Sequence, residues 1–247
     1  MITRSAPYAL LLAAGAGSRF GGDKLLARWQ GTPIITHVAT TIAQSVQSGV
    51  LSGAVAVLPP ASTTLAWPLD TAGFTLVENP HARRGMSTSL QRGLWALSLP
   101  SVVPEAAAAL VVLADQPLLR GEVIQALVTD WREHHRTVRP CYAASPDEPG
   151  HPVLLDRADW PLAHEALGDA GVGALLSEIP GGVRQVDVAG SNPDIDTPED
   201  LTRLGGDRRE EVGGGRWARL TAGPYTSSQH PAATPPRTTP PAAPPRP

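Results

Sequence analysis

Cysteine is nearly absent from this 247-residue chain, in which Cys141 is the single example. One thiol can form no internal disulfide and anchors no zinc motif, so we expect a reducing compartment. Long apolar runs are missing too, since no stretch approaches the roughly 20 apolar residues of a membrane span. The run Tyr8–Ala14 is too short for a signal peptide and ends in glycine instead of a cleavage site. These absences predict a soluble, cytoplasmic protein.

An excess of positive charge is also missing, because the formal net charge is -3. The segment from Gly205 onward carries six Arg against one Asp and two Glu, which leaves about -6 for residues 1–204. A polynucleotide-binding domain normally shows the opposite balance. The composition therefore argues against a nucleic-acid partner, while a small anionic ligand held by a few local cations stays compatible with it.

Short apolar runs alternate with amphipathic segments along the first 204 residues. Continuous apolar strands are typical of a parallel sheet that is buried on both faces. The alternation predicts an α/β fold, namely a single Rossmann-like three-layer domain with a mostly parallel sheet. Strands are expected at 8–14, 53–58, 74–77, 106–115, 140–144, 151–155 and 183–188. Helices are expected at 33–48 (with Thr32 as N-cap and Gly49 past the end), 87–97, 120–135, 162–167, 172–177 and 197–204.

The composition changes at Gly205. Residues 205–215 are rich in glycine and charge, and nine of the last 24 residues, Pro224–Pro247, are proline. Such a segment cannot bury enough apolar surface to offset the conformational entropy that it would lose on ordering. We therefore expect one folded domain over residues 1–204 and a disordered Gly/Pro-rich tail over 205–247. The tail is either dispensable or docks into an aromatic groove of a partner.

The glycine-rich loop after the first expected strand is typical of a phosphate-binding site. Residues 10–26 read LLLAAGAGSRFGGDKLL. A Walker A loop ends in Gly-Lys-[Ser/Thr], whereas Asp23 occupies the lysine position here and Leu25 follows Lys24. A dinucleotide-binding fingerprint requires a glycine where the chain has Phe20, and the acidic residue expected about 20 positions further on is missing. Both of these motifs are therefore disfavoured.

Completed as L-A-A-G-x-G-S-R-x-G-x-x-K over residues 12–24, this loop resembles the first motif of the molybdenum cofactor nucleotidyltransferases, which belong to the NTP transferase superfamily. The resemblance continues through five further motifs in the same order along the chain. These are ENPHARRGMSTSLQRGL (78–94), VVLADQPLL (111–119), PGHPVLL (149–155), GDAGVGALL (168–176) and DIDTPEDL (194–201).

The resemblance implies a reaction in which a phosphate oxygen of the acceptor attacks the α-phosphate of a nucleoside triphosphate, and pyrophosphate leaves. The acceptor brings its own nucleophile, so the protein supplies alignment and charge neutralisation. Glycines let the backbone approach the triphosphate, and Arg19 and Lys24 supply fixed positive charge as catalytic residues. The implied nucleotide-binding loop comprises Leu12, Ala13, Ala14, Gly15, Gly17, Ser18, Arg19 and Lys24.

Two carboxylates are expected to hold Mg²⁺. Asp115 follows the most apolar expected strand, and a carboxylate at the carboxyl end of a buried parallel strand points into the ligand crevice. Thr197 is the expected N-cap of the last helix, with Asp200 completing a capping box, which leaves Asp196 available. In the resembled family the positions of Asp115 and Asp196 carry the metal, and Asp115 is also catalytic. Asp194 is a weaker candidate that could be a structural turn residue.

The residues near the nucleobase favour CTP. Family members that transfer guanylate read Leu-Ala-Gly-Gly at the end of the first strand, and those that transfer cytidylate read Leu-Ala-Ala-Gly, as this chain does. The methyl group of Ala14 would narrow the pocket toward a pyrimidine. Ser87 and Ser89 place hydroxyls at a helix start near the nucleotide, although ordinary helix capping would use them equally well.

The acceptor side is assigned to His151 and Asp169, although a lone histidine is more often structural. The corresponding family block reads Gly-Asp-x-Gly-Ala-Arg, and Gly173 replaces its arginine here. The implied function is a Mg²⁺-dependent cytidylyltransferase that transfers CMP from CTP to the phosphate of molybdopterin. Its partners would be CTP, the molybdopterin-type acceptor and a molybdoenzyme client, without a nucleic acid or a membrane.

Three alternatives stay open at this point. The first is a nucleotidyltransferase with a sugar- or polyol-phosphate acceptor, which would keep the loop and both carboxylates. The second is an NAD(P)-dependent oxidoreductase of the nicotine blue oxidoreductase type, against which the glycine pattern argues. The third is a non-catalytic chaperone for cofactor insertion, against which the intact set of Lys24, Asp115 and Asp196 argues.

Overall fold

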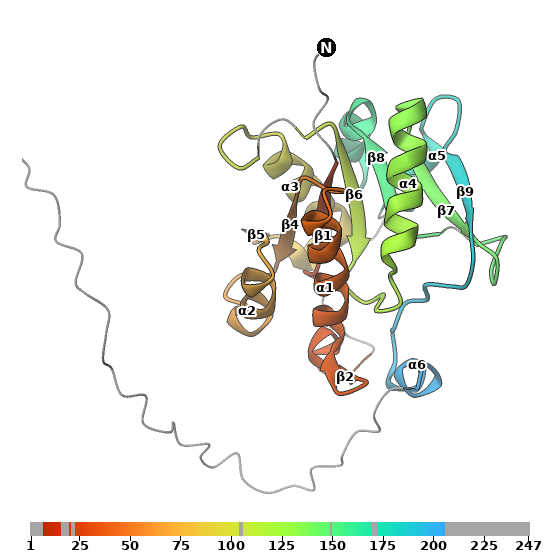
Figure 1. The fold of residues 1–247 in the computed structure, drawn as a ribbon. Coiled ribbons are helices and arrows are strands. Elements are labelled where there is room, and N and C mark those ends of the chain that lie inside the picture. The colour runs from red at the N-terminus through yellow and green to blue at the C-terminus, as the bar shows by residue number, and fades with distance from the viewer. Residues whose placement is uncertain are drawn as a thin grey trace, which may run out of the picture. The chain divides into compact units, whose positions relative to one another are not determined.

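A seven-stranded sheet forms the centre of the fold, with its strands in the order β5-β4-β1-β6-β8-β7-β9 (Figure 1). This computed structural model describes residues 7–15, 20, 23–103, 106–148, 150–168 and 172–205. Six strands of the sheet run in one direction, and β8 runs antiparallel to its neighbours β6 and β7. The strands are β1 (Tyr8–Leu12), β4 (Gly53–Leu58), β5 (Thr75–Glu78), β6 (Ala108–Leu113), β7 (Val138–Tyr142), β8 (Val153–Asp156) and β9 (Arg184–Val188).

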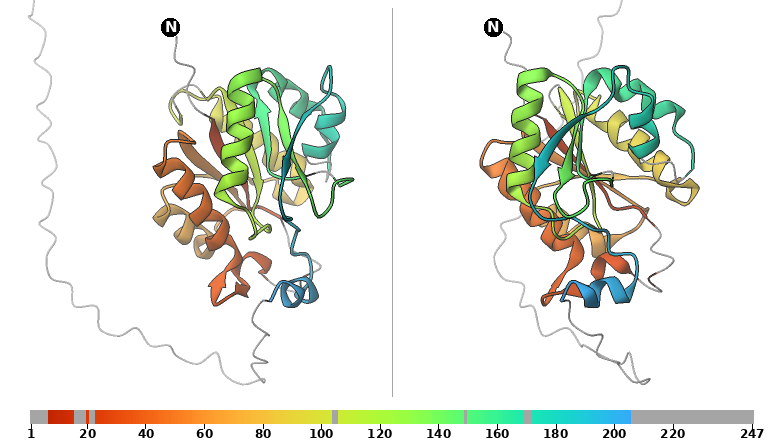
Figure 2. Two further views of the ribbon diagram at one scale, coloured as in Figure 1. Left: turned by 45° about the vertical axis from the view of Figure 1, so that its right-hand side comes forward. Right: turned by 90° about the vertical axis from the view of Figure 1, so that its right-hand side faces the viewer.

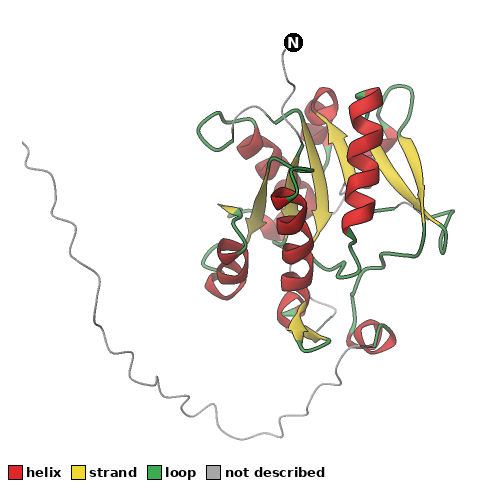
Figure 3. Cartoon of the chain, viewed as in Figure 1, coloured by secondary structure: helices red, strands yellow, loops and turns green. Residues whose placement is uncertain are grey.

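Helices cover both faces of this sheet, as Figures 2 and 3 show. Leu69 of α2 and Leu127 of α4 belong to a core cluster on one face, and Leu90 of α3 and Leu175 of α5 belong to a second cluster on the other. The predicted three-layer α/β architecture with a mostly parallel sheet is therefore confirmed. The helices are α1 (Ile34–Gln47), α2 (Thr63–Thr71), α3 (Met86–Leu97), α4 (Gly121–His134), α5 (Val172–Ser177) and α6 (Pro198–Arg203), with the 3₁₀ helices η1 (Lys24–Leu26), η2 (Ala82–Arg84) and η3 (Arg157–Glu165).

The strand order reverses between β1 and β6. The chain leaves β1 through α1 to reach β4 on one side, and it returns through α3 to place β6 on the other side of β1. Close packing of α3 on β1 depends on Gly93, because a Cβ atom there would lie 2.3 Å from a methyl carbon of Leu10. In open α/β sheets, ligands bind outside the carboxyl ends of the strands at such a reversal.

Some local details differ from the sequence-based expectations. Thr32 and Pro33 form the short strand β3, which pairs with β2 (Arg28–Trp29), so the expected Thr32 cap is wrong and α1 begins at Ile34. Pairing with β2 holds the backbone of both residues extended, which a helical first turn does not allow. The helix expected at 162–167 is instead the 3₁₀ helix η3. Gly49 lies past the end of α1 with a positive φ, as expected.

Several predicted positions lie outside the part of the chain that the structure describes. They are the loop residues Gly17, Ser18 and Arg19, the acceptor residue Asp169, and the tail beyond Gly205. The described residues all lie in the compact unit Met1–Arg208, and the second unit, Arg209–Pro247, is not described. No helix within the described ranges is long and apolar enough to cross a membrane.

Candidate active site

A cavity of about 330 Å³ opens at the carboxyl ends of β1 and β6, where the strand order reverses. The first loop, the turn after β6 and the start of α3 all contribute to its wall. The cavity therefore brings together predicted residues from three separate sequence motifs. Its lining comprises Leu12, Ala13, Ala14, Gly15, Lys24, Leu25, Ala82, Arg83, Gly85, Met86, Ser89, Leu113, Ala114 and Asp115.

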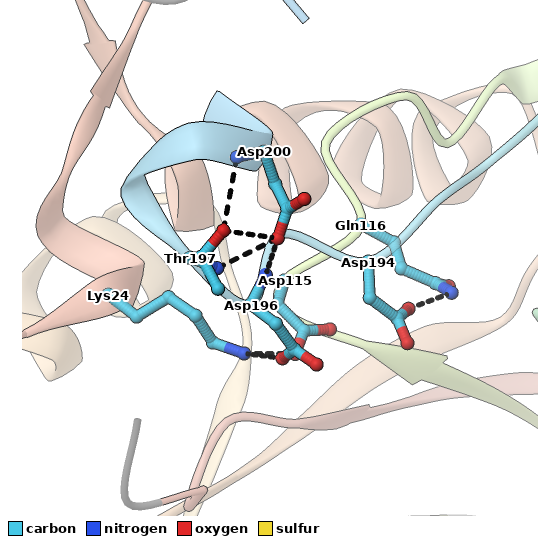
Figure 4. A network of polar contacts seen from close by, with 7 residues as sticks. All are labelled: Lys24, Asp115, Gln116, Asp194, Asp196, Thr197 and Asp200. Carbon is cyan, nitrogen blue, oxygen red and sulfur yellow. Dashed lines mark hydrogen bonds and ion pairs between the residues drawn. The ribbon is translucent and has the colours of Figure 1, made fainter. Parts of the chain in front are cut away.

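One ammonium group joins the two carboxylates that were predicted to bind metal. Lys24 Nζ lies 2.7 Å from Asp115 Oδ2 and 3.0 Å from Asp196 Oδ1 (Figure 4). Lys24 comes from η1, Asp115 follows β6, and Asp196 precedes α6. Asp115 lies 91 positions and Asp196 lies 172 positions after Lys24 in the sequence, so only the tertiary fold can bring them into contact.

The predicted capping box at the start of α6 is present and leaves the Asp196 carboxylate for the site. Thr197 Oγ1 accepts a hydrogen bond from the backbone N–H of Asp200, and the Asp200 carboxylate accepts one from the backbone N–H of Thr197. The same carboxylate also accepts the backbone N–H of Asp196 at 3.1 Å. This arrangement fixes the backbone of Asp196 while its side chain contacts Lys24.

The charges of this cluster support one another. Burial by itself lowers the pKa of Lys24, but attraction to Asp115 and hydrogen bonds to both carboxylates outweigh burial, so that its pKa is raised. Lys24 is therefore an ammonium ion at neutral pH. Its side chain is only 13% exposed, so the charge acts in surroundings with little water.

The donor set of the two carboxylates fits a hard divalent cation. Asp115 Oδ1 is buried and has no hydrogen-bond partner among the described residues, although Oδ2 pairs with Lys24. Mg²⁺ prefers one or two carboxylates and retains several waters. Within the described ranges, no group of three or more His, Cys, Asp or Glu side chains is placed to hold a metal. The Asp115–Asp196 pair thus suits a cation that substrate phosphates and waters also bind.

Asp194 and Asp196 have different partners. Asp194 Oδ1 accepts a hydrogen bond of 2.6 Å from Gln116 Nε2, whereas Asp196 pairs with Lys24. Burial raises the pKa of Asp194, and the nearby charge of Asp115 raises it further, against the effect of the Gln116 hydrogen bond. Asp194 is thus a hydrogen-bonded neighbour of the carboxylate pair.

His151 lies at the far end of the same polar region. Its backbone carbonyl accepts hydrogen bonds from Tyr142 Oη at 2.8 Å and from Asn192 Nδ2 at 3.3 Å. Burial lowers the pKa of His151, with Asp115 acting in the opposite direction, so the imidazole is neutral at pH 7. Its Nδ1 atom is buried and lacks a hydrogen-bond partner within the described residues, and His151 is not among the residues that line the cavity.

The two predicted serines are buried but differ in position. Ser89 lines the cavity, and its hydroxyl accepts a hydrogen bond from Asn79 Nδ2. Ser87 does not line the cavity, and its backbone N–H donates to the carbonyl of Gly168. Neither caps α3, whose N-cap is Gly85 without a side-chain hydrogen bond.

Sequence reasoning missed four polar or flexible residues of the site. Arg83 and Met86 line the cavity from η2 and the start of α3, inside a motif from which only the serines were selected. Gln116 and Asn192 are buried next to predicted carboxylates. Gln116 directly follows Asp115 and Asn192 lies two residues before Asp194, and this proximity in sequence was the available signal, because buried polar side chains are nearly always hydrogen-bonded.

Comparisons with known proteins show what the chain and its fold are similar to. Rv0371c from Mycobacterium tuberculosis H37Rv is 26% identical over 81% of this chain and 97% of its own chain, with a TM-score of 0.64. A structure of Rv0371c in complex with manganese is 23% identical over 82% and 98% of the two chains, with a TM-score of 0.62. No curated protein matches the chain.

Two solved structures of lower identity share the fold alone. One is a CMP:2-keto-3-deoxy-manno-octonic acid synthetase complexed with CTP, at 14% identity, a TM-score of 0.61, and coverage of 81% of this chain and 96% of that one. The other is molybdopterin-guanine dinucleotide biosynthesis protein A from Archaeoglobus fulgidus, at 17% identity, a TM-score of 0.56, and coverage of 80% and 96%. Residues 9–185 match the family model of the MobA-like NTP transferase domain, and the chain belongs to this family.

Proposed function

We propose that this protein transfers CMP from CTP to the phosphate of a molybdopterin-type acceptor. An acceptor phosphate oxygen forms a bond to the α-phosphorus of CTP, the bond from that phosphorus to the β-phosphate oxygen breaks, and pyrophosphate carries away the electron pair. The observation that carries the proposal is the contact of Lys24 with both Asp115 and Asp196 at the mouth of a nucleotide-sized cavity. Family membership and the CTP complex of a protein with the same fold support it.

The proposed roles follow from charge. Asp115 and Asp196 would hold Mg²⁺, which supplies charge neutralisation for the phosphates when bound. Lys24 contributes a compact positive charge that is suited to the β- and γ-phosphates and to the departing pyrophosphate. Backbone N–H groups from Gly15 onward would contact the triphosphate. Gly17, Ser18 and Arg19 are proposed to complete this loop.

The base role rests on the cavity wall, and the acceptor role rests on two residues that are not part of its described lining. Leu12, Ala13 and Ala14 line the cavity, and the buried Ala14 side chain is proposed to narrow it toward a pyrimidine. Ser89 and, behind it, Ser87 are proposed to shape the nucleotide pocket. The unpartnered Nδ1 of His151 is proposed to contact the acceptor, together with Asp169.

The experiment that tests this function compares nucleotides as ligands and as substrates. Thermal unfolding of the full chain is measured with CTP, GTP, ATP and NADPH, each with and without Mg²⁺, and pyrophosphate release is then measured with molybdopterin. We expect a rise in melting temperature with CTP that depends on Mg²⁺, because a ligand that binds only the folded state stabilises it. A shift with NADPH alone, independent of metal, would instead support the oxidoreductase alternative. Binding of cofactor without pyrophosphate release would support the chaperone alternative.

Restoring the family arginine separates the acceptor alternatives. Gly173 lies in α5, and a Cβ atom added there meets nothing within 4 Å, so Gly173→Arg fits the fold. With a molybdopterin acceptor we expect the KM for the acceptor to fall by about tenfold, because a charge-assisted hydrogen bond to its phosphate is gained. The affinity for CTP, measured by calorimetry, should stay unchanged.

The matched control for this variant is Gly121→Arg, at an equally open position in α4 on the opposite face of the sheet. An unchanged acceptor KM in Gly173→Arg together with normal CTP binding would count against a molybdopterin acceptor and favour a sugar- or polyol-phosphate.

We also propose that residues 1–204 form the whole nucleotidyltransferase domain. A chain that ends at Leu204 should then behave like the full chain in these assays.

A further inference from the structure

The side-chain amide of Gln116 lies at the edge of the candidate site, and both its nitrogen and its oxygen have a hydrogen-bond partner. Gln116 is 4% exposed and follows Asp115 directly. Its Nε2 donates a hydrogen bond of 2.6 Å to Asp194 Oδ1, and its Oε1 accepts one of 3.1 Å from Asn192 Nδ2 (Figure 4 shows the first of these). Gln116 therefore connects the turn after β6 to the segment that carries Asp194 and Asp196.

That segment needs such a connection. Residues 189–197 form neither a helix nor a strand, and they lead from β9 to α6. One backbone hydrogen bond, from the N–H of Ile195 to the carbonyl of Asp115, also joins the segment to the end of β6. Three carboxylates converge here, and like charges repel one another. Lys24 Nζ offsets part of this repulsion by contacting Asp115 and Asp196, and the hydrogen bond from Gln116 adds a fixed donor at Asp194.

The same amides extend to the acceptor side of the site. Asn192 is 8% exposed, and its Nδ2 also donates to the carbonyl of His151. Tyr142 Oη donates to that carbonyl as well. Gln116 thus lies at the centre of a chain of hydrogen bonds that runs from Asp194 to the backbone of His151.

We propose that Gln116 is a positioning residue that sets the separation of Asp115 and Asp196, and thereby the affinity of the site for a divalent cation. The inference rests on the proposed function, because it takes these two carboxylates as the cation ligands. Gln116 itself contacts neither cation nor nucleotide. It acts by holding the Asp194–Asp196 segment against the end of β6.

Three forms of the full chain with equal net charge test the proposal. The wild type has Gln116 and Asp194, and Gln116→Met has no hydrogen bond at this position but a similar side-chain volume. The double variant Gln116→Glu with Asp194→Asn exchanges the two groups, so that an amide now donates to a carboxylate in the opposite direction. Because the net charge is the same in all three, a difference in cation binding does not come from a change in total charge.

The measurement is the dissociation constant for Mn²⁺ without nucleotide, from the electron paramagnetic resonance signal of the free ion. We expect Gln116→Met to bind Mn²⁺ about tenfold more weakly, as is typical when a partner that orients a metal ligand is removed. The exchanged double variant should bind like the wild type. Gln125→Met is the matched control, because Gln125 donates to Thr129 on the exposed face of α4, and it should bind normally.

Each other outcome is decisive. Normal Mn²⁺ affinity in Gln116→Met overturns the positioning role and leaves the proposed function intact. Equal weakening in Gln116→Met and in the exchanged variant also overturns it, because the hydrogen bond was then restored without effect. A wild type that does not bind Mn²⁺ overturns both this inference and the proposed cation site. Melting temperatures of all variants identify any loss of binding that comes from unfolding.

Discussion

Asp115→Asn should lower the rate of CTP-dependent pyrophosphate release at least about a hundredfold. Asparagine has the same shape but no charge, so the site loses one of its two anionic ligands and Lys24 loses its 2.7 Å ion pair. The fold should persist, because Asp115 lies in a turn beyond β6 and is not part of either core cluster. The measurement is turnover at saturating CTP, with the melting temperature recorded in parallel.

The control for this variant is Asp70→Asn. Asp70 is exposed on α2, away from the site, and the same substitution there should leave turnover unchanged. Turnover of Asp115→Asn close to that of the wild type would remove Asp115 from the cation site. Loss of turnover accompanied by a large fall in melting temperature would assign it a structural role instead.

Lys24→Met should strengthen the binding of a divalent cation and weaken the use of CTP. The ammonium group lies between the two carboxylates and offsets one of their two negative charges, so its removal leaves both charges for a cation. We therefore expect nucleotide-free Lys24→Met to bind Mn²⁺ more tightly than the wild type. The same variant should use CTP at least about a hundredfold less efficiently, because a positive charge near the phosphates is lost. Manganese titration and kcat/KM for CTP measure the two effects.

The composition of the chain makes Lys24 easy to follow. Lys24 is the one lysine in the whole sequence, and the other nineteen basic residues of the Lys+Arg total are arginines. Lysine carries a compact point charge, whereas the planar guanidinium of arginine is broader. Lys24→Arg should therefore use CTP less efficiently than the wild type.

In a nuclear magnetic resonance spectrum of the protein made with labelled lysine, the Lys24 side chain would give a single resonance. This resonance should shift when CTP draws the ammonium group from the carboxylates. Weaker Mn²⁺ binding in Lys24→Met, or an unmoved resonance, would contradict this account.

Local sequence patterns alone predicted most of the elements. The runs at 53–58 and 172–177 match β4 and α5 residue for residue, and α3 and α4 begin or end within one residue of the predicted limits. The cause is that burial on both faces requires continuous apolar strands, and one-sided burial requires helical spacing. The capping box of Thr197 and Asp200 was equally readable, because its partners are three residues apart.

Elements whose local signal is weak or misleading escaped prediction. Helix α2 contains Pro68, and proline normally ends a helix, so the stretch offered no clear helical pattern. Thr32 and Pro33 carry a good helix-start signal, yet pairing with β2 places them in a strand. The antiparallel direction of β8 has no local signature either, because an apolar strand reads the same way in both directions.

The sequence by itself determined the fold class, the family resemblance and the choice of Lys24, Asp115 and Asp196 as candidate site residues. Tertiary structure alone decided that Lys24 lies between Asp115 and Asp196, and that Gln116 joins their two segments. The physical reason is range. Strand, helix and capping preferences act over a few residues, whereas these contacts connect positions that approach one another only after the sheet has assembled.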